Sequence, residues 1–189
     1  MASLWLEAWR GPYAWVSLDE EENDLRGFLN YLLAAIRKAF PKACATTYSL
    51  MQAPVLPPVS VLSRYLLNDL DQIEDPFILV VDDYHKIHEK AVHDLMTAIL
   101  THPPQNLHLM LLTRRDPPLL ISALRGRGQM NEIGTYDLQF TAKETAVFLK
   151  NTLGLSVDGK TAAFIQEKLE GWPAENAPGL TVFEVFGRS

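Results

Sequence analysis

The sequence contains little cysteine, little positive charge and no long apolar run, and each shortage excludes a class of protein. Cys44 is the only cysteine among the 189 residues, so neither an intramolecular disulfide nor a cysteine-rich zinc cluster can form. A formal net charge of −6 argues against a broad nucleic-acid surface, because neutralising phosphates takes clustered lysines and arginines. We therefore expect no direct DNA contact from this chain and, since one free thiol suits a reducing compartment, a cytoplasmic protein.

Membrane, hydrolase and zinc signatures are also missing. No apolar run approaches the roughly 18 residues that span a bilayer, and the first residues lack a basic stretch followed by an apolar one. We expect neither a membrane anchor nor a signal peptide. The GxSxG pattern of a serine-hydrolase elbow does not occur. His85, His88 and His93 lie close in sequence, but their spacing is not that of a zinc-binding helix, so we do not expect a metal cluster there.

The most informative stretch of the chain is an apolar run, residues 77–81, which ends in Asp82 and Asp83. Five consecutive large apolar residues favour a strand buried on both faces, as in a parallel sheet covered by helices, and predict an α/β domain. Open α/β sheets bind ligands at the carboxyl ends of their strands, where one Asp can hold a hard cation and a second can orient a water. The alternative is a buried strand that ends in a solvated acidic turn.

The remaining segments alternate between helical and strand patterns, as an α/β layered domain requires. Apolar runs predict further strands at residues 13–18, 107–112 and 130–133. Apolar periodicity predicts helices at residues 23–36, 60–73, 89–100, 119–125, 141–152 and after 158, and the end of a helix at 1–9. Asn23, Thr141 and Asp158 are the predicted N-caps, Gly171 is predicted to close the last helix, and the proline-rich residues 42–58 are predicted to form a mobile loop.

Six of these segments, taken in order, resemble the ATPase core of the MalT-like, LuxR-type transcriptional regulators, a branch of the STAND class of P-loop ATPases. The resemblance covers most of the chain. It is carried by YAWVSLDEEENDLRGFLNYLLAAI (13–36), FILVVDDYHKI (77–87), LHLMLLTRRDPP (107–118), LRGRGQMNEI (124–133), DLQFTAKETAVFL (137–149) and EGWPA (170–174).

The resemblance implies ATP and magnesium as ligands and assigns three residues to them. Asp82 is then the magnesium-side acid of the Walker B motif, Asp83 is the acid that activates water, and Arg114 is the sensor arginine that faces the terminal phosphate. Arg115 could take the place of Arg114. An arginine beside bound phosphates supplies charge and hydrogen-bond donors where the transition state is anionic.

One family feature is missing from the sequence, the glycine-rich GxGKT phosphate loop. Backbone N–H groups and the lysine of that loop cradle the phosphates, so we expect most of the nucleotide affinity to be absent. The family strand before that loop is missing too, and it lies centrally, between the strands at 107–112 and 130–133. We therefore expect a gap in the sheet, which TVFEVF (181–186) could fill.

The sequence thus predicts a three-layer P-loop NTPase-like α/β domain that lacks its first strand and phosphate loop, followed by a small helical lid. The predicted parts are the core at 1–136, the lid at 137–174 and a divergent tail at 175–189, as expected for a truncated or frameshifted product. The predicted function is a nucleotide-switch core of a transcriptional regulator that cannot hydrolyse ATP alone. The alternative is a non-catalytic interaction fragment, which at most pairs with another chain.

Arg125 and Arg127, near the end of the predicted core, have two interpretations. They either face a phosphate or a neighbouring subunit, or they form a solvated basic turn. The tryptophans are interpreted as core or interface residues.

Overall fold

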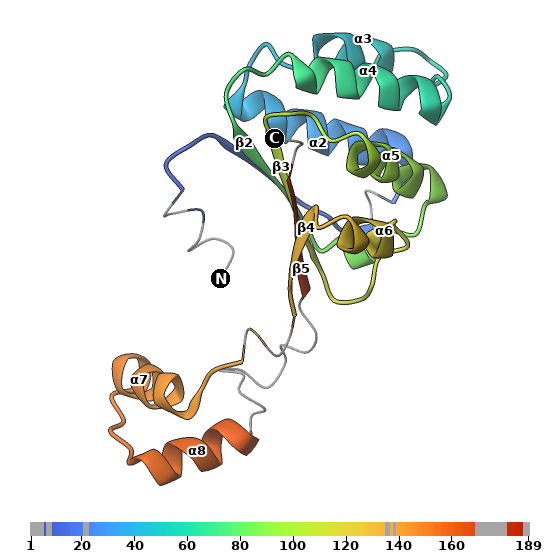
Figure 1. Cartoon of the computed structure of the whole chain (residues 1–189). Coiled ribbons are helices and arrows are strands. Elements are labelled where there is room, and N and C mark those ends of the chain that lie inside the picture. The colour runs from blue at the N-terminus through green and yellow to red at the C-terminus, as the bar shows by residue number, and fades with distance from the viewer. Residues whose placement is uncertain are drawn as a thin grey trace. The chain divides into compact units, whose positions relative to one another are not determined.

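A computed structural model of the chain describes residues 6, 9–20, 23–134, 137, 139–168 and 181–186, and the structural statements below concern these residues (Figure 1). The strands are β1 (Tyr13–Ser17), β2 (Phe77–Asp82), β3 (Leu107–Thr113), β4 (Met130–Ile133) and β5 (Thr181–Phe186). The helices are α2 (Leu25–Ala39), α3 (Ala45–Met51), α4 (Val59–Asp71), α5 (Lys90–Thr101), α6 (Ile121–Gly126), α7 (Ala142–Leu153) and α8 (Gly159–Lys168), with the short 3-10 helix η2 (Tyr84–Lys86). No described helix has the length and apolar character needed to cross a membrane.

The five strands form one sheet in the order β1-β2-β3-β5-β4. β2 pairs in parallel with β1 on one side and with β3 on the other, with Val80 opposite Trp15 and Met110. Residues 77–81 are each at most 1% exposed, as expected for a strand covered on both faces. The predicted α/β fold and the predicted order of the first three strands are confirmed.

The gap expected beside β3 is filled by β5, which lies between β3 and β4. Val182, Phe183 and Val185 are all buried, and the last two belong to the main hydrophobic core. β3 is buried along nearly its whole length, so an unpaired edge there would leave backbone N–H and C=O groups without partners, at about 1–3 kcal/mol for each buried group. The prediction that residues 181–186 fill the gap is confirmed.

Helices α2 to α6 gather on one face of the sheet (Figure 1). Their apolar stripes pack on the strands in one continuous core, in which Phe28, Leu66 and Leu95 are fully buried. The predicted three-layer architecture also requires a layer of helices on the opposite face of the sheet. The helix predicted at residues 1–9 lies outside the described residues except at Leu6, which is helical and buried, and Trp9.

The cap of α2 differs from the prediction by one residue. Asp24, not Asn23, is the N-cap, and its carboxylate accepts hydrogen bonds from the backbone N–H groups of Arg26 and Gly27. The side chain of Asn23 instead reaches across to the backbone before α5, where its Oδ1 accepts from the N–H groups of two residues, His88 and Glu89. The prediction failed because sequence shows which residues can cap but not a long-range partner that competes for one of them.

The predicted loop at residues 42–58 contains a helix, α3, so that prediction was wrong for residues 45–51. Cys44 precedes α3 with a φ of 54°, and Asp69 of α4 holds the first turn, because its Oδ2 lies 2.7 Å from both the N and the Oγ1 of Thr47. The guanidinium of Arg26 donates to the carbonyl oxygens of Met51 and Ala53. These contacts come from distant residues, so local periodicity could not show them.

Residues 133–181 form a compact unit of their own, while Val182–Ser189 join residues 1–132 in the other. In the small unit, α7 begins with the predicted capping box between Thr141 and Glu144, and Gly154 ends it with a φ of 69°. Asp158 caps α8 as predicted, because its Oδ1 accepts from the N–H of Thr161 at 2.8 Å. The closure of α8 at Gly171 lies outside the described residues, and the lid role of 137–174 stays a prediction.

Replacing Val185 by Ala tests the place of β5 in the core. Val185 is 3% exposed, so we expect the shortened side chain to lower the free energy of unfolding by about 2 kcal/mol. Val55→Ala is the matched control, because Val55 is 82% exposed and its change should stay within about 0.5 kcal/mol. Urea unfolding of both variants measures this, and equal effects would contradict the burial of β5.

Candidate functional site

The candidate site lies where β1, β2 and β3 end. Parallel strands bring their carboxyl ends to one edge of a sheet, so Leu18, Asp82 and Asp83 come near the turn that follows Thr113. The backbone N–H of Leu18 donates to the carbonyl oxygen of Asp82 at 3.1 Å, which extends the β1–β2 ladder to the edge. Arg114 follows Thr113 directly, so the structure brings the three predicted site residues to the same edge.

Asp82 is the last residue of β2, and its side chain is half-buried. Its Oδ1 accepts a hydrogen bond from the backbone N–H of Asp83 at 2.8 Å. Burial raises the pKa of Asp82 above its ordinary value, and the negative charge of Asp83 raises it further. The folded chain therefore holds an anionic oxygen ligand here against an electrostatic cost, which a bound cation would relieve.

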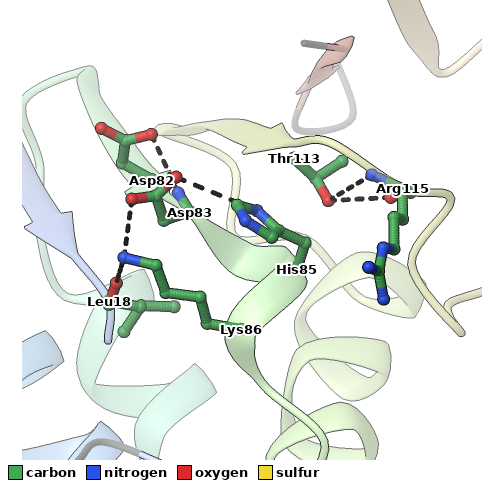
Figure 2. A network of polar contacts seen from close by, with 7 residues as sticks. All are labelled: Leu18, Asp82, Asp83, His85, Lys86, Thr113 and Arg115. Atoms are coloured by element: carbon green, nitrogen blue, oxygen red, sulfur yellow. Dashed lines mark hydrogen bonds and ion pairs between the residues drawn. The ribbon is translucent and has the colours of Figure 1, made fainter. Parts of the chain in front are cut away.

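Asp83 turns the chain out of the sheet with a φ of 58°, in the left-handed region that Asp tolerates better than most residues. Lys86 reaches back from η2, and its Nζ lies 2.9 Å from Asp83 Oδ2 and 3.0 Å from the carbonyl oxygen of Leu18 (Figure 2). The lysine thereby neutralises Asp83 and ties it to β1. The sequence reasoning missed Lys86, although its position three residues after Asp83 was a usable signal.

His85 lies between the acids and the turn after β3 (Figure 2). Its Nδ1 is buried and has no hydrogen-bond partner among the described residues, and its nearest carboxylate atom is Asp83 Oδ1 at 3.9 Å. Burial lowers the pKa of His85, with the charge of Asp83 opposing and that of Arg114 adding to the effect. The ring is therefore neutral near pH 7 and presents an unfilled polar atom at the site.

Thr113 shapes the turn that carries the arginines. Its side chain is fully buried, and its Oγ1 donates to the carbonyl oxygen of Arg115 at 2.8 Å and accepts from that residue's N–H at 3.4 Å. Both arginines are exposed, but the charge of Arg114 is close enough to lower the pKa of His85. The sequence reasoning did not single out Thr113, whose role depends on a turn that no periodicity reveals.

The other sequence candidates lie in different surroundings. Arg125 pairs with Glu132 of β4, its Nη2 lying 2.5 Å from Glu132 Oε2, while Arg127 is exposed. Nδ1 of His93 lies 2.8 Å from the hydroxyl of Tyr84. In the part of the chain that the structure describes, no three His, Cys, Asp or Glu side chains gather as a metal cluster.

The residues at the edge fit a magnesium ion whose remaining ligands are water and the phosphates of a bound substrate. Mg²⁺ usually takes one or two carboxylates and completes its shell with water and substrate phosphates, and Asp82 and Asp83 supply that number. The exposed Arg114 offers a cationic group for a phosphate. The GxGKT loop that would hold most of the anion does not occur in the sequence, and the GxxxxGKT match at residues 154–161 follows a helix, not a strand, and belongs to the other unit.

The chain is similar in sequence to HTH-type transcriptional regulators named MalT. It is 35% identical over 174 residues to the HTH-type transcriptional regulator MalT of Vibrio cholerae, covering 92% of this chain and 19% of the relative. MalT of Serratia proteamaculans is 36% identical over 165 residues (87% and 18%), and that of Klebsiella pneumoniae 34% over 172 (91% and 19%). The resemblance to MalT-like regulators is therefore confirmed, and the chain spans about a fifth of the length of these relatives. No protein-family profile matches the chain.

Asp82→Asn tests the electrostatic cost of the site. A raised pKa in the folded state means that protonation of Asp82 favours folding at low pH, and that this contribution is lost as the pH rises through the folded-state pKa. Asn keeps an oxygen acceptor for the N–H of Asp83 without the charge. We therefore expect Asp82→Asn to be more stable than the wild type at pH 7, with the gain vanishing near pH 3.

Urea unfolding between pH 3 and pH 8 measures this difference. Asp71→Asn, which removes an exposed carboxylate at the end of α4, is the control for the change in net charge. A stability difference for Asp82→Asn that does not change with pH would contradict the interpretation.

Proposed function

We propose that this chain, which is related over most of its length to one segment of the MalT regulators, is part of a nucleotide-dependent switch of the STAND type. The observation that supports this most is the edge itself. Asp82 is the last residue of β2, whose other residues are buried, Asp83 follows it, and Arg114 follows β3, the strand paired beside it. Carboxylates for a metal and a cation for an anionic ligand at the ends of adjacent parallel strands form the arrangement in which α/β sheets bind phosphates.

In this proposal each residue has one task. Asp82 would hold magnesium, directly or through water, because it is half-buried and Lys86 forms its ion pair with Asp83 and not with Asp82. Asp83 would orient a water, and Arg114 would face the terminal phosphate. ATP supplies the phosphate anhydride and the negative charge that these groups recognise. Nucleotide binding would then shift the population of two states of the regulator, as in other nucleotide switches.

The missing phosphate loop and the pairing of Lys86 with Asp83 both oppose turnover by this chain alone. Lys86 holds one of the two carboxylate oxygens of Asp83 at 2.9 Å, so only the other remains to orient a water. The GxGKT phosphate loop of the family, which would bring the nucleotide into place, also does not occur in the sequence. We therefore propose binding without hydrolysis, in a cytoplasmic protein that makes no direct DNA contact through this segment and whose residues 137–174 act as a lid.

A second candidate function is a non-catalytic interaction module. The observation that favours it is the position of β5, which completes the sheet beside β3 with a strand of apolar residues. With β5 in this place, the sheet beside β3 is complete, and the domain does not need a phosphate loop in order to fold. The next two tests separate the candidates.

Magnesium-dependent binding of a fluorescent ATP analogue tests the switch proposal. We expect weak binding that Asp82→Ala lowers about tenfold or more, because it removes a metal ligand, and that His85→Ala changes less. Asp71→Ala is the control for a lost surface carboxylate. Equal losses from Asp82→Ala and His85→Ala would argue against the metal role of Asp82, and no binding at all would favour the interaction module.

Phosphate release from ATP tests the claim of binding without hydrolysis. We expect no release above a no-protein blank, and Asp83→Asn to leave that result unchanged. Turnover that Asp83→Asn abolishes would overturn the claim.

A further inference from the structure

Lys86 brings a positive charge to the same sheet edge at which the proposed switch would bind a divalent cation. Its Nζ lies 2.9 Å from Asp83 Oδ2 and 3.0 Å from the carbonyl oxygen of Leu18 (Figure 2). A carboxylate and a backbone carbonyl are the kinds of protein oxygen that hard cations also bind. The ammonium group of Lys86 therefore has the surroundings that a small cation would choose.

The segment that carries Lys86 is tied to the chain that follows β1 at two points. One is the contact of the lysine itself with Leu18. The other lies just beyond η2, where the backbone N–H groups of His88 and Glu89 donate to Oδ1 of Asn23 at 2.7 and 2.9 Å. The lysine thus extends from a backbone that is already fixed on both sides of it, which lowers the conformational entropy lost when it pairs with Asp83.

The charge of Lys86 acts on both acids of the site. The hydrogen bond to Asp83 raises the pKa of Lys86, and the charges of nearby carboxylates raise this pKa further, so the amine is protonated at neutral pH. Burial raises the pKa of Asp82, whereas Lys86 is one of the groups that lower it. A divalent cation at Asp82 would therefore be repelled by the ammonium group, which already acts on the same carboxylate.

We propose that Lys86 is a resident counter-ion that competes with a divalent cation for Asp83 and so sets the affinity of the sheet edge for that cation. While the lysine holds Asp83, Asp82 is the acid left for the cation. Replacing the lysine by a neutral side chain makes both acids available. This inference rests on the assignment of Asp82 and Asp83 to a metal under the proposed function, but it does not require a nucleotide.

Binding of Mn²⁺ to the whole chain without nucleotide tests this role. Bound Mn²⁺ loses the sharp electron paramagnetic resonance signal of the free ion, so a titration gives the dissociation constant. Lys86→Met keeps an unbranched side chain but removes the charge, and we expect it to bind Mn²⁺ about tenfold or more tightly than the wild type does. Lys86→Arg keeps the charge and should bind as weakly as the wild type.

The matched control is Lys90→Met. Lys90 also pairs with an aspartate, Asp94, and its loss changes the net charge equally, but its side chain is 83% exposed against 34% for Lys86. Mn²⁺ affinity of this variant should stay within about twofold of the wild type, because solvent screens the charge. Adding Asp83→Asn to Lys86→Met should remove most of the gain, since the freed carboxylate is then gone.

Four results would overturn the proposal: no gain in Lys86→Met, an equal gain in Lys90→Met, an equal gain in Lys86→Arg, or a gain that survives the addition of Asp83→Asn. Lys86→Gln is a second neutral variant with the same expected gain, to be used where circular dichroism shows that Lys86→Met does not fold. Absence of Mn²⁺ binding to both neutral variants would overturn the proposal as well.

The outcome for Lys86 can be told apart from the outcome for the nucleotide switch. A gain in Mn²⁺ affinity without binding of the fluorescent ATP analogue would support the counter-ion role and count against the switch. Binding of the analogue to the wild type, without a gain in Mn²⁺ affinity for the neutral Lys86 variants, would overturn the counter-ion role alone.

Discussion

The structure depends first on the pairing of β2 with a parallel strand on each side. Its residues 77–81 are each at most 1% exposed, so the strand is covered on both faces, and it has backbone partners at both edges. This environment fixes where the strand stops, because Asp82 cannot follow the apolar residues into the core without a large cost. The two acids are therefore placed at the sheet edge by the limit of burial.

A second constraint acts on the other side of β3. Buried backbone groups need partners, and β3 is buried almost throughout. The sheet meets that need with β5, a segment whose β-branched and aromatic residues fit a buried strand and whose neighbours in sequence belong to a different unit. Completion of the sheet thus takes precedence over the order of segments along the chain.

The same two constraints explain which features the sequence could predict. Apolar runs mark β1, β2 and β3 because burial on both faces leaves a composition that no other element shares, and the acids after β2 follow from the run itself. The missing central strand, taken from the family resemblance, identified β5 as its replacement. Long-range polar contacts were out of reach: Asn23 bonds to the segment before α5, and Asp69 holds the start of α3. Lys86 was readable in principle, since an acid and a lysine three residues apart can pair on one helical turn, but nothing in the sequence says that such a turn follows β2.

β3 connects the candidate site to β5. Its partner on one side is β2, which carries Asp82, and on the other side β5, while its own end carries Thr113 and the arginine turn. Loss of β5 would leave β2 paired on both sides and so leave the acids in place. It would leave β3 paired on one side only, and with it the turn that presents Arg114. The acidic and the cationic halves of the site are thus supported differently, since the acids depend on the β1–β2–β3 pairing and the arginine turn also depends on β5.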